Sequence, residues 1–306
     1  MKKSAIIILI VSLIVFVTSL TAAITLTVRT NGWDDLGNVS RFGQNIDNLV
    51  SRGSWIDLPI GSSVSHSIDK IHEIDPQGIS EIHITGLSES ILISAADNQI
   101  SARLEGTYTT RTNKVEWEAK TSGSTLYLNV KYPRYGLRFS QMSIHVAIPS
   151  QFSGIVKVNT LSGTSRLDVD VTDRMTAYYH DSLSGSLRIE NGGETDIIFS
   201  TLSGSVDIAG LNGKVSGETM SGNVNIELDN LHTFDVETLS GDITLTLPAA
   251  TDADINFSTL SGSFDSKNLT VETIRQERRL LLAKLNQGGQ KIDAETLSGD
   301  FTMIGR

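Results

Sequence analysis

The acidic side chains are the residues of this sequence whose types and spacing come nearest to a catalytic pattern. Two carboxylates about 5 to 9 Å apart can cleave a glycosidic bond. In a chain of stacked repeats, however, most acids reach a neighbour at such distances, so the spacing has little specificity. We therefore expect a solvated acidic face, with a cation site and glycan cleavage as alternatives. No catalytic role is assigned to the acids that follow the recurrent turns, which are Asp168, Asp170, Asp207, Asp242, Asp265 and Asp300.

The histidines and serines do not form a recognisable site either. None of the six histidines belongs to an HExxH motif, and we expect His66 and His72, six residues apart in a polar stretch, to be solvated. His180 falls on an apolar column, which favours a packing role. The serines recur as turn residues without a Gly-x-Ser-x-Gly elbow, so they do not indicate a hydrolase. We expect no metal site and no cofactor.

The composition narrows the class of protein. The 306 residues are 39% hydrophobic, enough for one large domain or two ordinary ones. The absence of cysteine excludes disulfide scaffolds, thiolate zinc sites and cysteine catalysis. A formal charge of -10 argues against nucleic acid as a partner, because phosphate binding depends largely on lysine and arginine.

The beginning of the sequence resembles a membrane anchor in composition. Residues 4–28 are uncharged and lie between Lys3 and Arg29. A helix needs about 20 apolar residues to cross the hydrocarbon core, so we expect a transmembrane helix within residues 1–28. A signal peptide cleaved near Ala23 is the alternative. In both cases the remainder is expected outside the cytoplasm. Residues 29–58 have no sustained period and are interpreted as a juxtamembrane spacer.

A short motif, Thr/Ser-Leu/Met-Ser-Gly, recurs seven times. Successive glycines are 22, 19, 18, 19, 21 and 37 residues apart, and a period near 20 is typical of a solenoid. The last interval is close to twice the others, which predicts one hidden coil. We interpret the seven glycines as structural turn residues, namely Gly163, Gly185, Gly204, Gly222, Gly241, Gly262 and Gly299.

Apolar residues keep fixed positions relative to these glycines. Phe234 stands seven residues before Gly241, and Val206 stands two after Gly204, while Asp207 beside it is polar. This alternation is typical of a strand with one buried face. The phase changes at the Leu or Met, so the motif should form a corner, in which glycine supplies backbone angles closed to other residues. We expect the Thr hydroxyls to form a ladder. The prediction is an all-β fold, a parallel β-solenoid (single-stranded β-helix) of about 20-residue coils.

The solenoid domain is expected to span residues 59–306. Strand-like stretches in residues 59–149 repeat less exactly, and we interpret them as opening coils and a cap with antiparallel excursions, followed by regular repeats in residues 150–306. Residues 270–290 interrupt the repeat, either as a strand pair turning at the glycines or as a short helix. The coil after Gly299 is expected to leave an open edge suited to self-association.

The repeated corner resembles the bacterial putative-adhesin family of envelope β-solenoids, a family of unknown function related to head GIN domains. The resemblance rests on the phrase Thr-Leu-Ser-Gly-Asp-Ile-Thr-Leu at residues 238–245 and on the Ile148-Pro149 ending of the preceding strand. It covers roughly residues 60 to 306. It implies surface display without naming a ligand, and it supplies no catalytic motif.

The sequence therefore predicts a non-enzymatic, membrane-anchored and exported β-solenoid that serves adhesion or cell-envelope organisation. We expect a single-pass protein of the cell membrane with its C-terminal domain outside. The expected partners are the membrane, through residues 4–28, and an envelope glycan or protein. The alternatives are an envelope sensing or regulatory protein that binds a peptide or glycan and, third, a glycan-active β-helix enzyme.

Overall fold

The computed structural model describes residues 63–111, 114–133, 137, 139–168, 171 and 174–306. All described residues belong to one compact unit, Ile56–Arg306. Every element of the described residues is a β-strand, as the alternation predicts. The expected anchor, the spacer and Asp170 lie outside the described residues. Within the described part, no helix is long and apolar enough to cross a membrane.

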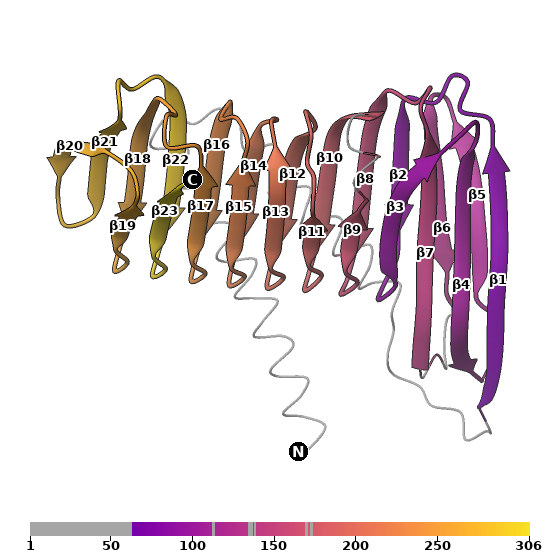
Figure 1. The fold of residues 1–306 in the computed structure, drawn as a ribbon. Coiled ribbons are helices and arrows are strands. Elements are labelled where there is room, and N and C mark those ends of the chain that lie inside the picture. Colours follow the sequence, from indigo (N-terminus) through magenta and orange to yellow (C-terminus); the bar gives the residue numbers. More distant parts are fainter. Residues whose placement is uncertain (1–62, 112–113, 134–136, 138, 169–170, 172–173) are drawn as a thin grey trace, which may run out of the picture. The chain divides into compact units, whose positions relative to one another are not determined.

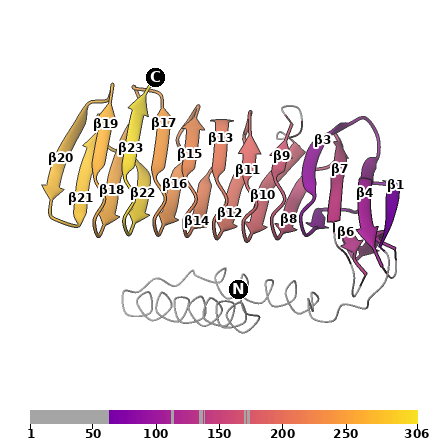
Figure 2. The same ribbon diagram turned by 90° about the horizontal axis from the view of Figure 1, so that it is seen from below.

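The strands form two sheets that face each other along the stack (Figures 1 and 2). Sheet A has eleven strands in the order β1-β4-β7-β3-β9-β11-β13-β15-β17-β23-β19. Their bounds are β1 Val64–Ile74, β3 Ser90–Ala96, β4 Ile100–Thr110, β7 Phe139–Pro149, β9 Ser165–Leu167, β11 Leu187–Ile189, β13 Val206–Leu211, β15 Val224–Leu228, β17 Ile243–Leu247, β19 Phe264–Lys267 and β23 Phe301–Gly305.

Sheet B has twelve strands in the order β20-β21-β18-β22-β16-β14-β12-β10-β8-β2-β6-β5. Their bounds are β2 Glu81–Thr85, β5 Glu116–Ser122, β6 Thr125–Lys131, β8 Gly154–Thr160, β10 Met175–Ser182, β12 Asp196–Thr201, β14 Val215–Thr219, β16 Thr233–Thr238, β18 Ala253–Thr259, β20 Val271–Gln276, β21 Leu280–Leu285 and β22 Gln290–Thr296.

Each regular coil gives one strand to each sheet, and neighbouring coils pair in parallel. In sheet A, Val206 pairs with Val224 and Val224 pairs with Ile243, so equivalent residues lie directly above one another. The apolar residues that keep fixed positions relative to the turn glycines face inward, and Val206 and Phe234 among them have no exposed surface. A single coil has no partner for these side chains, so stability comes from stacking. The solenoid-like, all-β class is confirmed.

The first part of the described chain is less regular. β2 and β3 join the stack in parallel with β8 and β9. β1, β4 and β7 pair antiparallel in sheet A, and β5 pairs antiparallel with β6 in sheet B. Trp117 of β5 is buried, and its indole nitrogen donates to the carbonyl of Ala102 on β4, which ties the two sheets together at this end.

The order of the coils differs from the order of the sequence near the other end. β22 lies between β16 and β18, and β23 lies between β17 and β19. Residues 290–306 are thus inserted between two coils that precede them. The expected hidden coil is wrong, because the extra residues form the antiparallel strands β20 and β21 beside β18. The expected open edge after Gly299 is also wrong, because β23 is paired on both sides.

Candidate functional site

The recurrent motif closes each coil by a hydrogen bond within the motif itself. In five copies the glycine N–H donates to the Thr hydroxyl three residues earlier, for example from Gly241 to Thr238 at 2.9 Å. The expected ladder of hydroxyls occurs only in part, between Ser182 and Thr201 and between Thr296 and Thr259. The Thr therefore serves mainly as the acceptor that fixes its own corner.

The turn glycines are required for a reason that the sequence did not suggest. None of the seven has a positive φ, so conformational freedom does not explain them. A Cβ on Gly241 would instead collide with the carbonyl oxygen of Gly222 in the preceding coil, and the same clash recurs along the stack. At the first motif, a Cβ on Gly163 would collide with the carbonyl oxygen of Glu89, so Glu89 takes the place of a preceding turn glycine. The Glu89 carboxylate accepts from the N–H of Leu87.

A row of apolar side chains runs along this corner of the stack. The Leu or Met of each motif is half-buried or exposed, and Leu260 and Leu297 each expose 44% of their surface. The Ser beside it donates to a carbonyl of the adjacent coil, as from Ser240 to Met220. We call this row the corner ridge. It comprises Leu87, Leu161, Leu183, Leu202, Met220, Leu239, Leu297 and Leu260.

The outer face of sheet B carries acids in register over three adjacent strands. Glu237 pairs with Glu218 on one side and with Glu295 on the other, and Asp235 pairs with Asp293. Among the described residues, no Lys or Arg forms an ion pair with any of these five carboxylates. We call these five residues the acid face. Like charges on directly paired strands destabilise a sheet, so stability alone does not account for the arrangement.

The acid face has perturbed protonation equilibria. Partial burial, together with the charges of Glu218, Glu295 and Asp235, raises the pKa of Glu237 to about 7. Burial and the nearby Asp235 raise the pKa of Glu218, and burial with Asp293 and Glu295 raises that of Asp235. Glu237 is therefore partly protonated near neutral pH, and it would bind a cationic partner more strongly once its proton leaves.

The other half of the same face has the opposite character. Glu81 forms ion pairs with Lys157 and, at 2.8 Å, with His83, and the Lys157 and His83 contacts lower its pKa to about 2. The ammonium of Lys157 lies 5.4 Å from the ring centroid of Tyr179 on the next strand. The face therefore changes along the stack from a paired, aromatic and cationic region to an unpaired acidic one.

The acids singled out in the sequence that lie among the described residues take part in local interactions of the stack. Asp242 accepts from the N–H of Asp300, and Asp300 in turn accepts from the N–H of Ser263, so both cap the next coil. Asp207 accepts from the side chain of Asn225 at 2.8 Å, and Asp265 lies 3.8 Å from Lys267. The backbone N–H of Asp168 donates to the carbonyl oxygen of Ile93.

The histidines are dispersed over the described residues. His66 stacks on Tyr108, and His72 lies 3.1 Å from the carbonyl oxygen of Trp117. His180 is fully buried, and burial lowers its pKa to about 4, while a contact with the Gly185 backbone opposes the shift. No group of three or more His, Asp or Glu side chains in the described part is arranged to hold a metal ion.

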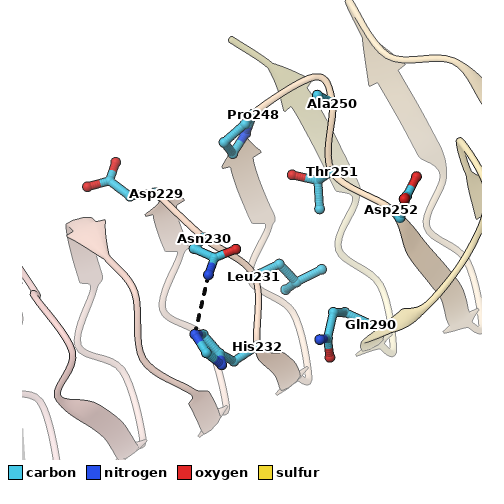
Figure 3. A pocket seen from close by; sticks show the side chains of 9 residues that line it. All are labelled: Asp229, Asn230, Leu231, His232, Pro248, Ala250, Thr251, Asp252 and Gln290. Atoms are coloured by element: carbon cyan, nitrogen blue, oxygen red, sulfur yellow. Dashed lines mark hydrogen bonds between the residues drawn. The ribbon is translucent and has the colours of Figure 1, made fainter.

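An open groove of about 430 Å³ is lined by loops that connect strands of sheet A to strands of sheet B (Figure 3). The loop between β15 and β16 contributes Leu231 and His232, and Nε2 of His232 lies 3.5 Å from the Asn230 amide. The loop between β17 and β18 contributes Asp252, and Gln290 begins β22. The groove combines hydrogen-bonding groups with a small apolar floor. It is too open to exclude water, which disfavours catalysis but permits binding of a hydroxyl-rich ligand.

Comparisons with known proteins agree with this architecture. Residues 156–303 match the family model described as Toastrack DUF4097. No curated protein matches the chain. A structure from Clostridium sporogenes, titled a putative cell adhesion protein, is 13% identical, covers 79% of this chain and 100% of its own, and has a TM-score of 0.36.

Two further solved structures are similar at the same level. One from Bacteroides fragilis, titled a putative adhesin, is 11% identical, covers 78% of this chain and 97% of its own, and has a TM-score of 0.41. One from Parabacteroides distasonis, titled a putative lipid binding protein, is 16% identical, covers 80% and 97%, and has a TM-score of 0.34. The family predicted from the repeated corner is confirmed, and residues 156–303 are a Toastrack domain of the DUF4097 family, whose function is unknown.

Proposed function

We propose that this protein is a non-enzymatic, membrane-anchored and exported solenoid that presents the acid face to partners in adhesion or in cell-envelope organisation. The single observation that carries the proposal is the in-register row of Glu218, Glu237 and Glu295, which lacks cationic partners among the described residues. Such a row costs stability when it is left uncompensated. A cationic segment of another envelope protein would compensate it.

The assignment as a non-enzyme is supported by how the acids are used. The Asp242 carboxylate accepts from the backbone N–H of Asp300, and the Asp300 carboxylate accepts from that of Ser263, so both acids have a structural role in the stack. The wide groove would leave a reaction exposed to water. A glycan-active enzyme remains the third choice, and hydrolysis of envelope glycans by the purified chain would overturn the assignment.

The location is proposed from residues 4–28. Because this uncharged run is long enough to span a membrane and follows two lysines, the mature chain should keep its N-terminus and sediment with membranes. N-terminal sequencing decides between this form and a secreted one. A soluble protein that begins near Ile24 would show that the segment is a cleaved signal peptide.

The acid face is tested by capture of partners from envelope extract with the full chain in detergent. We compare the triple variant Glu218→Gln, Glu237→Gln and Glu295→Gln with a control that removes three acids elsewhere, Glu194→Gln, Asp207→Asn and Asp265→Asn. Loss of captured proteins in the first variant alone supports the proposal. Equal capture by both variants contradicts it, because the two differ only in where the charge is removed.

The alternative is an envelope sensing protein that binds a glycan in the groove. His232, Asn230 and Gln290 supply donors and acceptors there, and Leu231 supplies an apolar surface. Glycan-array binding that is lost in Gln290→Ala but kept in the triple acid-face variant would favour this function over the first.

A further inference from the structure

The coil formed by residues 290–306 fills a slot that earlier residues create. β16 and β17 form one wall of the slot, and β18 and β19 form the other. Since neighbouring strands lie about 4.8 Å apart, the two walls stand roughly 10 Å from each other. We call residues 290–306 the inserted coil. Both walls stand earlier in the sequence than the coil that separates them.

The inserted coil makes contacts that any copy of this chain could make equally well. Ile292, Phe301 and Met303 are fully buried between the walls. The ring of Phe301 is stacked with that of Phe234 at a centroid distance of 6.3 Å and lies tilted against that of Phe257 at 5.5 Å. Its corner sequence, Thr-Leu-Ser-Gly-Asp at residues 296–300, is identical to that of the wall at residues 238–242. The slot therefore recognises the repeat and does not distinguish the chain that donates it.

The connection that leads into the inserted coil is a short turn of four residues. Three of the four residues between β21 and β22 have positive φ, namely Asn286 at 52°, Gly288 at 77° and Gly289 at 147°. The turn must pass the start of β18, where the Asn286 amide donates to the carbonyl oxygens of Ala249 and Thr251. A short hinge favours exchange, because it allows the segment that follows it to reach its own slot in few conformations.

The order of synthesis also leaves the slot open for a time. The last residue of the walls is Lys267 at the end of β19, and the inserted coil begins at Gln290. Chains are synthesised at about 5 to 20 residues per second, so the walls exist for roughly a second or more before the inserted coil of the same chain is made. A coil from another copy meets the same surface during this interval.

We propose that this protein forms strand-exchanged oligomers, in which the inserted coil of one copy fills the slot of a second copy. The exchanged state keeps every contact of the inserted coil and changes only the hinge, so the two states differ little in contact energy. This proposal does not depend on the acid face or on the location of the chain. Its occupant is a second copy of this chain.

The test uses engineered cysteines, because the natural chain has none. Thr244 of β17 pairs in register with Thr302 of β23, and both are half-buried. Parallel neighbours lie within the Cα separation that a disulfide needs. Full-length Thr244→Cys and Thr302→Cys chains with different tags are mixed in urea, refolded together in detergent and oxidised. Exchange predicts a disulfide-linked dimer with both tags, whose yield falls on dilution before refolding.

The matched control replaces Thr244→Cys by Asn225→Cys. Asn225 lies one coil farther from the slot, in register with Thr244. It stands about two strand spacings from residue 302 even in an exchanged dimer, so only random collision would link this pair. A yield from the Thr244 pair no greater than that from the Asn225 pair overturns the proposal.

A hinge variant provides a second, independent test. Gly288→Ala adds a side chain at a φ of 77° and opposite the Asp254 carboxylate, which penalises the closed hinge. It should raise the exchanged fraction roughly five- to thirty-fold per hinge. Gly123→Ala is the control, since Gly123 has a φ of 61° with no atom nearby and lies in the turn between β5 and β6. An unchanged dimer fraction in Gly288→Ala overturns the proposal.

Discussion

The carbonyl oxygen of Gly222 points at the place where a Cβ on Gly241 would stand, nearer than the 3.0 Å that real Cβ contacts respect. The next coil repeats the relationship, because a Cβ on Gly299 would meet the carbonyl oxygen of Gly241. The obstacle is backbone and cannot rotate away. The glycines thus set the distance between coils at the corner, and any side chain there would push two coils apart.

We expect Gly241→Ala to lower the free energy of unfolding by more than about 3 kcal/mol, above the usual cost of overpacking, because the obstacle is a rigid carbonyl. Thermal and urea unfolding measure the change. The control is Gly123→Ala, which adds a side chain in open space at a positive φ and should cost only about 1 to 2 kcal/mol. Equal losses in both variants would show that conformation, and not stacking, requires the corner glycines.

The inward and outward positions of a strand should respond oppositely to charge. Val206 is fully buried and Asp207 beside it is exposed. Val206→Asp places an unpaired carboxylate in the core and should prevent folding, since such burial costs several kcal/mol. Asp207→Val loses only the hydrogen bond from Asn225 and should remain folded. Circular dichroism and solubility of the two variants check this, and similar behaviour would contradict the assigned faces.

The contribution of His180 to the stability of the domain should fall as the pH decreases from about 6.5 towards 4, while the acid face contributes in the opposite direction. Its pKa in the fold, about 4, lies below its ordinary value of 6.5, because burial disfavours the charged ring. The contribution is complete above pH 6.5 and is lost on acidification, by roughly 3 kcal/mol at most.

His180→Phe tests this assignment. The replacement resembles Phe199, which occupies the paired position on β12, and the variant should lose less stability than the parent between pH 7 and pH 5, because the contribution of His180 is removed. Melting temperatures of both proteins at pH 7 and pH 5 provide the measurement. If the variant loses as much stability on acidification as the parent, His180 is not the group responsible.

The acid face should show the opposite trend with pH. The pKa of Glu237, about 7, lies above its ordinary value of 4.5, so its stabilising contribution is present below pH 4.5 and is lost as the pH rises through 7. Glu237→Gln should therefore raise the free energy of unfolding by roughly 1 to 3 kcal/mol at pH 8 and by little at pH 4.

Asp265→Asn is the matched control for this variant. The Asp265 side chain is 60% exposed and lies outside the acid face, so its replacement should change stability little at either pH. A gain at pH 8 from Asp265→Asn equal to that from Glu237→Gln would mean that net charge, and not the paired row, destabilises the fold.

Much of the local structure follows from short-range sequence patterns. Strand-like stretches were expected within residues 59–149, and the strands β1 to β7 lie there. The inward columns also hold, because alternation along a strand admits only two faces. The acid face, in contrast, was missed. Its members stand at outward positions of the repeat, which were not compared between coils. Aligning the residues that stand four before each turn glycine would have brought Glu218, Glu237 and Glu295 together.

What the sequence by itself determined is the unit: a coil with two inward faces and a corner closed by Thr and Gly. Only the tertiary structure decided the order of the units and the reason for the glycines. All coils carry the same inward columns of apolar residues. The coil with its corner at residues 296–300 can therefore pack beside the coil of residues 238–242 as well as it could at the end of the stack. The free energies of hydrophobic burial and of backbone pairing therefore differ little between these two orders of coils. The extra strands β20 and β21, which occupy the far side of β18, and the turn at Asn286 then direct residues 290–306 into the slot.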